Sequence, residues 1–153
     1  MKGIVFSLGI VWLFFGVVAV CGTAHAQLGA VPPRAVLASV AIGALATAIL
    51  VVNNLRDREN DARKQKWTLA ARFGERFARI EHSLLFAIAF TCVAAVAIDD
   101  APGWWLPWLA LPSAVWITLK VWRRDGTDLN PLLGATARLE LGFGLLLCVG
   151  VLL

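Results

Sequence analysis

One asparagine and two aspartates recur at intervals of four residues near the middle of the chain. Asn53, Asp57 and Asp61 would share one face if a helix continues through them, because residues four apart lie one turn apart. Two carboxylates so placed repel each other, so the arrangement makes most sense with a hard cation between them. Oxygen ligands favour Mg²⁺, which typically bridges carboxylates to a substrate phosphate. The spacing therefore indicates Mg²⁺ chemistry.

Basic residues surround these acids and leave a second interpretation open. They are Arg56, Arg58, Arg63, Lys64 and Lys66. Such a set could neutralise a diphosphate. The same charges would also suit an ordinary cytoplasmic loop in which the acids are surface partners. Because a D-x-x-x-D spacing is a weak signal, it does not decide between a binding site and a charged loop.

The remainder of the chain must position this polar stretch, and it is strongly apolar. Of 153 residues, 59% are hydrophobic and only 16% are charged. A helix crosses the hydrocarbon core of about 30 Å with roughly 20 residues. We therefore predict an all-α fold, in which residues 1–153 form a single membrane domain, a polytopic membrane helical bundle of five transmembrane helices. Their predicted bounds are about 4–22, 35–53 continuing into the polar motif, 68–98, 104–122 and 132–152.

The basic residues are distributed unevenly between the two sides of this predicted bundle. Thirteen of the 14 lie at the N-terminus or in the second and fourth connections, and only Arg34 lies on the other side. The positive-inside rule makes the crowded side cytoplasmic. We therefore expect a multi-pass protein of the cell (inner) membrane with a cytoplasmic motif. No nucleic-acid reading module accompanies the basic charge. Residues 1–26 also imitate a secretory signal, an alternative that charge balance disfavours.

Three polar positions outside the motif carry expectations of their own. Thr68 is predicted to cap the third helix, and Asn130 is predicted to cap the last one, with proline at the next position. Arg138 and Glu140 follow in the last helix near the cytoplasmic side. We expect them to form an interfacial pair, and the alternative is that they line a cavity.

The polar stretch resembles the second aspartate-rich motif of the UbiA prenyltransferase superfamily. The similarity rests on N-N-L-R-D-x-x-x-D at 53–61, on Lys66, and on T-L-A-x-R-x-G at 68–74. Two further segments, L-F-F-G at 13–16 and L-N-P-L-L at 129–133, are similar to the 1,4-dihydroxy-2-naphthoate polyprenyltransferase branch. The product of that branch feeds menaquinone biosynthesis. The similarity covers nearly the whole chain.

The resemblance implies an enzyme and a set of site residues. Family members have nine helices around a central cavity, and two aspartate-rich motifs hold Mg²⁺ and bind the diphosphate of a polyprenyl donor. An aromatic quinone precursor attacks the allylic cation, and in this branch the naphthoate loses its carboxyl group. Carried over to this sequence, the metal ligands would be Asp57 and Asp61. The diphosphate-binding residues would be Asn53, Asn54, Arg56 and Lys66.

Three departures from the family pattern qualify this implication. The first motif, of the N-D-x-x-D type, is absent, so the five helices match helices five to nine. Gln65 stands where the family has glycine, and V-F-S-L at 5–8 replaces a glycine-rich acidic approach. We expect a fragment, split gene product or degenerate copy that requires an N-terminal half. The alternative is a non-catalytic membrane remnant or partner subunit that binds isoprenoid diphosphate or packs with another helical chain.

Overall fold

The computed structural model describes residues 8–98 and 102–153, and the regular structure in these two ranges is helical. The predicted all-α fold is therefore confirmed. In chain order the elements are the π-helix η1 (Trp12–Cys21), α2 (Gly22–Leu28), α3 (Pro33–Arg63), α4 (Leu69–Ile98), the 3-10 helix η2 (Pro102–Ala110), α5 (Leu111–Arg123), the 3-10 helix η3 (Gly126–Leu129) and α6 (Asn130–Leu152).

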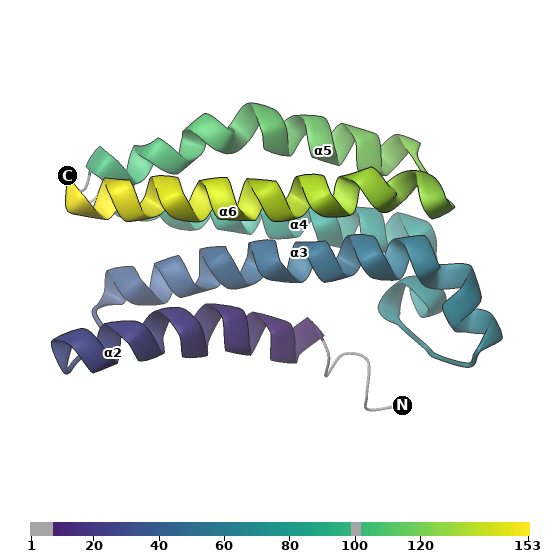
Figure 1. The fold of residues 1–153 in the computed structure, drawn as a ribbon, viewed down its shortest axis with the longest axis horizontal. Helices are drawn as coiled ribbons and strands as arrows, with labels where there is room; N and C mark the ends of the chain where they lie inside the picture. The colour runs from purple at the N-terminus through teal and green to yellow at the C-terminus, as the bar shows by residue number, and fades with distance from the viewer. Residues whose placement is uncertain (1–7, 99–101) are drawn as a thin grey trace.

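The long helices lie side by side along one axis (Figure 1). Helices α3, α4 and α6 form the centre of the bundle, and α3 packs against both α4 and η1. The segment of η1 and α2 covers one side of α3, and η2 with α5 runs along α6 on the other side (Figure 1). The α3–α4 connection and η3 lie at one end of the bundle, opposite the C-terminus (Figure 1). This arrangement places the polar motif at the end where α6 begins.

Within the described residues, four helical segments are long and apolar enough to cross a membrane. They span Leu8–Leu28, Pro33–Arg63, Leu69–Ile98 and Gly126–Leu152. The predicted helix at 104–122 is instead divided into η2 and α5, which contain Pro107 and Pro112. Proline lacks a backbone N–H and therefore interrupts regular helical hydrogen bonding. The five predicted crossings thus correspond to four continuous segments and one divided one.

The first predicted helix ends later than the sequence suggested. It continues beyond residue 22 to Leu28 and ends at Gly29, which has a φ of 69°. That left-handed conformation is typical of a glycine that terminates a helix. Residues 4–7 of the prediction lie outside the described residues.

Helix α3 continues through the motif, as the sequence predicted. Its 31 residues correspond to about 46 Å at about 1.5 Å per residue, which exceeds a hydrocarbon core of about 30 Å. The apolar part ends at Val52, so the charged residues from Arg56 onward lie beyond the apolar part of the helix. Helix α4 follows after a short loop, in which the Thr68 hydroxyl accepts a hydrogen bond from the Ala71 amide at 3.2 Å. This contact confirms the predicted cap.

Two glycines allow η1 to approach α3 closely. A Cβ built on Gly43 would lie 2.8 Å from Cδ1 of Trp12, and one built on Gly16 would clash with the backbone of α3. On α3, Ala41, Ala44 and other small side chains are fully buried. Small residues permit this close packing of helices where no hydrophobic effect drives association in lipid.

Candidate functional site

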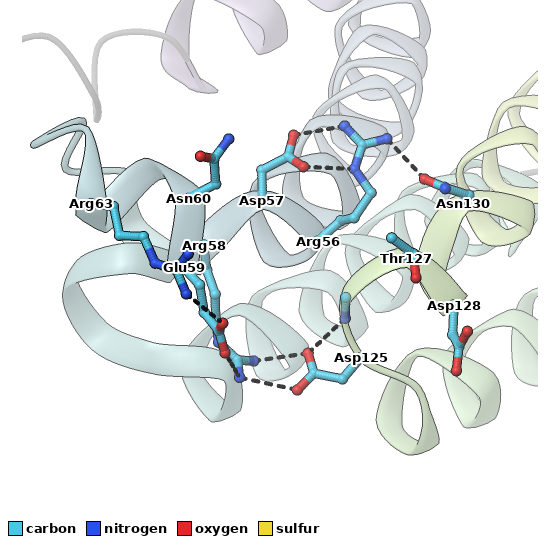
Figure 2. A pocket seen from close by; sticks show the side chains of 11 residues that line it. Arg56, Asp57, Arg58, Glu59, Asn60, Arg63, Asp125, Thr127, Asp128 and Asn130 are labelled. Atoms are coloured by element: carbon cyan, nitrogen blue, oxygen red, sulfur yellow. Dashed lines mark hydrogen bonds and ion pairs between the residues drawn. The ribbon is translucent and has the colours of Figure 1, made fainter.

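A polar cavity of about 710 Å³ opens at the cytoplasm-facing end predicted for the bundle. One wall is the charged end of α3, residues 56–60 with Arg63, and the other is the connection that leads into α6, residues 125–128 with Asn130. Figure 2 shows these two walls facing each other, with Arg56 between Asp57 and Asn130 and with Arg58 turned toward Asp125. The cavity therefore combines the predicted motif with residues about seventy positions later in the chain.

Arg56 is the centre of the hydrogen-bond network in this cavity. Its Nε and Nη2 atoms donate to Oδ1 and Oδ2 of Asp57 at 2.8 and 2.6 Å. Nη2 also donates to Oδ1 of Asn53 at 2.8 Å, and Nη1 donates to Oδ1 of Asn130 at 3.1 Å. A guanidinium offers five donors in a rigid fork, which suits several oxygen acceptors at once. Arg56 thereby orients Asp57 and joins α3 to the first turn of α6.

The same contact favours the charged form of the Asp57 carboxyl group. Its hydrogen bond from the Arg56 guanidinium lowers the pKa of Asp57 below the ordinary aspartate value. The reciprocal hydrogen bond raises the pKa of Arg56. A hydrogen bond to a charged group favours its charged form. Asp57 is therefore a carboxylate at neutral pH, as a metal ligand must be.

Asp61 belongs to a separate contact that closes the loop after α3. Lys66 Nζ lies 3.4 Å from both carboxylate oxygens of Asp61, and the Lys66 amide donates to the Asp61 carbonyl at 2.8 Å. The Asp61 side chain is 8% exposed, whereas that of Lys66 is 61% exposed. Between them Gln65 has a φ of 56°, the left-handed conformation that favours glycine. The family's glycine would therefore suit the backbone conformation that residue 65 adopts in this chain.

A second arginine holds the opposite part of the cavity together. Arg58 donates from Nη1 and Nη2 to the two carboxylate oxygens of Asp125 at 3.0 Å each, and Nη1 also bonds Glu75 of α4. Arg79 of α4 donates to the Arg124 carbonyl at 3.1 Å. These contacts connect α3, α4 and the segment before η3, so the cavity walls are fixed by ion pairs between elements.

The structure brings together only part of the predicted site. Asn53, Arg56 and Asp57 form one network, but Asp61 and Lys66 pair with each other and do not line the cavity. Asn54 is 6% exposed and does not line it either. Two residues were missed as site residues. Asp125 gave no signal beyond its charge, and Asn130 was expected to be a helix cap.

That expectation for Asn130 is wrong. Leu129 is the N-cap of α6, Asn130 already lies within the helix, and its side chain accepts a hydrogen bond from Arg56. The expected pairing of Arg138 with Glu140 is wrong as well, since no ion pair joins them in the described residues. Arg138 lines a cavity of about 530 Å³ between α5 and α6, and Glu140 lines one of about 320 Å³ beside α3. Both residues therefore line cavities, as the alternative interpretation predicted.

The carboxylates suit a hard cation in type but are few. Within residues 8–98 and 102–153, no group of three or more His, Cys, Asp or Glu side chains is placed to hold a metal. Each carboxylate oxygen can accept more than one contact, so the bonds from Arg56 and Lys66 leave capacity for a metal. Mg²⁺ commonly takes one or two protein carboxylates and completes its shell with water and phosphate. Both carboxylates are therefore of the right chemical type, but only Asp57 lines the cavity, and a Mg²⁺ site shared by Asp57 and Asp61 stays a prediction.

Comparisons with known proteins agree with the motif. The sequence model of the UbiA prenyltransferase family matches residues 2–140. Over 146 residues the chain is 34% identical to 1,4-dihydroxy-2-naphthoate octaprenyltransferase of Haemophilus influenzae and 36% identical to the enzyme of the same name from Escherichia coli. Each alignment covers 94% of this chain and 47% of the relative. A Mycobacterium leprae protein with that name is 36% identical over 129 residues, which are 82% of this chain and 43% of that protein.

The chain spans about half the length of the curated relatives that it matches. No solved structure matches it. The family match runs from the first helical segment through the aspartate motif and into α6, and so includes every residue of the Arg56 network. The chain therefore belongs to the UbiA prenyltransferase family.

Proposed function

We propose that this chain provides the diphosphate-binding part of a prenyltransferase of menaquinone biosynthesis. The donor would be a polyprenyl diphosphate and the acceptor 1,4-dihydroxy-2-naphthoate, at the cytoplasmic face of the cell (inner) membrane. The observation that carries the proposal is the Arg56 network, which faces a polar cavity at the end of an apolar bundle. The names of the relatives supply the substrates. An N-terminal half with the second set of carboxylates would complete the site.

Each residue of the motif then has a chemical task. Asp57 and Asp61 would hold Mg²⁺, which when bound stabilises the negative charge of the leaving diphosphate. Arg56 and Lys66 would turn donors toward diphosphate oxygens, which accept bidentate contacts as carboxylates do. Asn53 would orient Arg56 through its existing hydrogen bond. Asn54 is buried, so its contribution would come with a small movement of the end of α3.

In the proposed reaction, the transferred prenyl group would lie at the inner end of the charged cavity. The bond between the first prenyl carbon and the diphosphate oxygen breaks, and its electron pair leaves with the diphosphate. A ring carbon of the acceptor then forms the new carbon–carbon bond with the allylic cation, and the bond between the ring and its carboxylate breaks, so that its electron pair restores the aromatic ring and CO₂ leaves. The diphosphate must remain at the charged end while the prenyl chain extends into apolar surroundings. The location of Arg56 and Asp57 at the border of the apolar part of α3 meets this requirement.

A specific observation favours a second candidate, a non-catalytic subunit that binds isoprenoid diphosphate. Both carboxylates of the motif are already bound by basic side chains of the same chain, Asp57 by Arg56 and Asp61 by Lys66. A motif satisfied internally needs no metal to be stable. Such a protein would bind a diphosphate through its arginines without performing transfer.

Transfer and binding assays separate the two candidates. Membranes containing this chain, alone and with an added N-terminal half of a relative, would be tested for Mg²⁺-dependent transfer of a polyprenyl group to dihydroxynaphthoate. We expect transfer only with both halves, and its loss in Asp57→Asn but not in Glu81→Gln, a carboxylate on α4 that does not line the cavity. Binding of pyrophosphate without transfer in any combination would favour the second candidate. Unchanged transfer in Asp57→Ala would refute the site assignment.

A further inference from the structure

An apolar cavity of about 320 Å³ lies between η1, α3 and α6, deeper in the bundle than the charged network. Six of its lining side chains are apolar, Val11, Phe15, Ala46, Ile49, Leu50 and Leu133. The other two are polar, Asn53 and Glu140. An apolar cavity with a few convergent polar groups is the usual form of a small-molecule site.

Asn53 connects this cavity to the diphosphate-binding network. Its side chain lines the cavity and also accepts the hydrogen bond from Arg56 Nη2 at 2.8 Å. From Asn53 the lining residues of α3 continue to Ala46, seven residues or about 10 Å along the helix. A molecule in this cavity would therefore lie immediately beside the group that Arg56 and Asp57 bind.

Glu140 lies at the deep end of the same cavity. Helix α6 begins at Asn130, which contacts Arg56, and Glu140 follows ten residues later, about 15 Å further into the bundle. Its carboxyl group has no hydrogen-bond or ion-pair partner among the described residues. Arg138, the nearest basic residue in sequence, lines a different cavity. An ionisable side chain inside a membrane bundle is costly, and it commonly marks a substrate path.

The chemistry of Glu140 decides which substrate suits the cavity. A prenyl chain has no hydrogen-bond donor, so if it filled the cavity it would cover the half-buried carboxyl group without offering it a partner, at a cost. A hydroxyaromatic molecule fills apolar space with its ring and offers an O–H group to the carboxylate. We propose that Glu140 accepts a hydrogen bond from a hydroxyl group of the aromatic acceptor and so selects a hydroxyaromatic molecule for this cavity. The proposal rests on the proposed function for the reaction, and its test does not depend on transfer.

Two naphthalene probes that differ at one group test this directly. The full chain in proteoliposomes would be titrated with 1-naphthol and with 1-methoxynaphthalene, after subtraction of binding to protein-free vesicles. We expect the unaltered chain to prefer 1-naphthol. Glu140→Leu should weaken 1-naphthol binding about tenfold or more and change 1-methoxynaphthalene binding less than twofold. Glu140→Gln, which keeps a carbonyl acceptor and the side-chain shape, should lose less than Glu140→Leu.

Glu81→Leu is the matched control, because Glu81 is also a partly exposed carboxylate on a membrane helix but does not line this cavity. It should bind both probes as the unaltered chain does. Circular dichroism checks that each variant keeps its helices. If Glu140→Leu loses them, Glu140→Gln takes its place in the comparison. Equal 1-naphthol binding in the unaltered chain and both Glu140 variants would overturn the proposal. An equal loss of binding for the two probes would overturn it too, because such a loss would reflect a change in the shape of the cavity.

Mg²⁺-dependent binding of inorganic pyrophosphate, compared between the unaltered chain and Asp57→Asn, reports on the proposed function separately. If pyrophosphate binding fails while the Glu140 variants still discriminate between the two probes, the diphosphate site is wrong and the hydroxyaromatic site stands. If pyrophosphate binds through Asp57 but the two probes are not discriminated, the hydroxyaromatic site is wrong and the diphosphate site stands.

Discussion

Arg56 donates hydrogen bonds to both carboxylate oxygens of Asp57, the residue that follows it, at 2.8 and 2.6 Å. The same guanidinium contacts Asn53 and Asn130. One side chain therefore orients a proposed metal ligand, borders the apolar cavity through Asn53 and secures the start of α6. Because of these contacts, we expect binding at the site to weaken even when Arg56 is replaced by another basic residue.

Arg56→Lys keeps the positive charge but removes the planar fork that holds both oxygens of Asp57. We expect Mg²⁺-dependent pyrophosphate binding to weaken about tenfold, which corresponds to the loss of one or two charge-assisted hydrogen bonds. Isothermal titration of the chain in detergent micelles measures it. Arg123→Lys, an exposed replacement at the end of α5, is the control and should bind as before. Equal affinities for Arg56→Lys and the control would contradict the proposed role of the fork.

The bidentate pair of Arg58 and Asp125 should couple the walls of the charged cavity. Its two contacts are 3.0 Å long, and the side chains are 20% and 49% exposed. A double-mutant cycle with Arg58→Met and Asp125→Asn should give a coupling free energy of about 1 kcal/mol, reduced by solvent screening. Unfolding of the chain in mixed micelles provides the free energies. A coupling indistinguishable from zero would show that the walls are held by other contacts.

Replacement of Gln65 by glycine should be neutral or stabilising, because this residue already has a φ of 56°. Glycine adopts that conformation without the steric cost that a side chain brings, although it adds freedom to the unfolded chain. Gln65→Val should lower the free energy of unfolding by about 1 kcal/mol or more, since β-branched residues rarely adopt positive φ. Equilibrium unfolding of both variants measures the difference. Equal stability of the two would mean that the loop relaxes to another conformation.

Gly43→Ala should weaken the packing of η1 against α3. A Cβ at this position would lie 2.8 Å from Cδ1 of Trp12 and 2.9 Å from its carbonyl oxygen, and backbone cannot easily yield. Overpacking of this kind typically costs about 1–3 kcal/mol, which unfolding measurements would detect. Gly142→Ala is the matched control, because a Cβ built there has no neighbour within 4 Å. If both substitutions had the same effect, helix propensity rather than the contact with Trp12 would explain it.

The helical segments and their order could be predicted from the sequence, because segment length, apolar composition and proline position act locally. The continuation of the second helix through the motif to Arg63 is one such result. The family could be identified from the same local signals, since N-N-L-R-D and L-N-P-L-L are contiguous. Local signals failed at Asn130, where the choice between a cap and a long-range partner depends on what lies nearby in space.

The tertiary structure alone decided which motif residues meet. The Arg56–Asn130 and Arg58–Asp125 contacts join residues 74 and 67 positions apart, and no spacing in the sequence indicates them. It also separated the Asp61–Lys66 pair from the cavity and placed Glu140 in a different cavity from Arg138. The physical reason is that helix periodicity determines which face a residue occupies, whereas helix packing determines what that face meets.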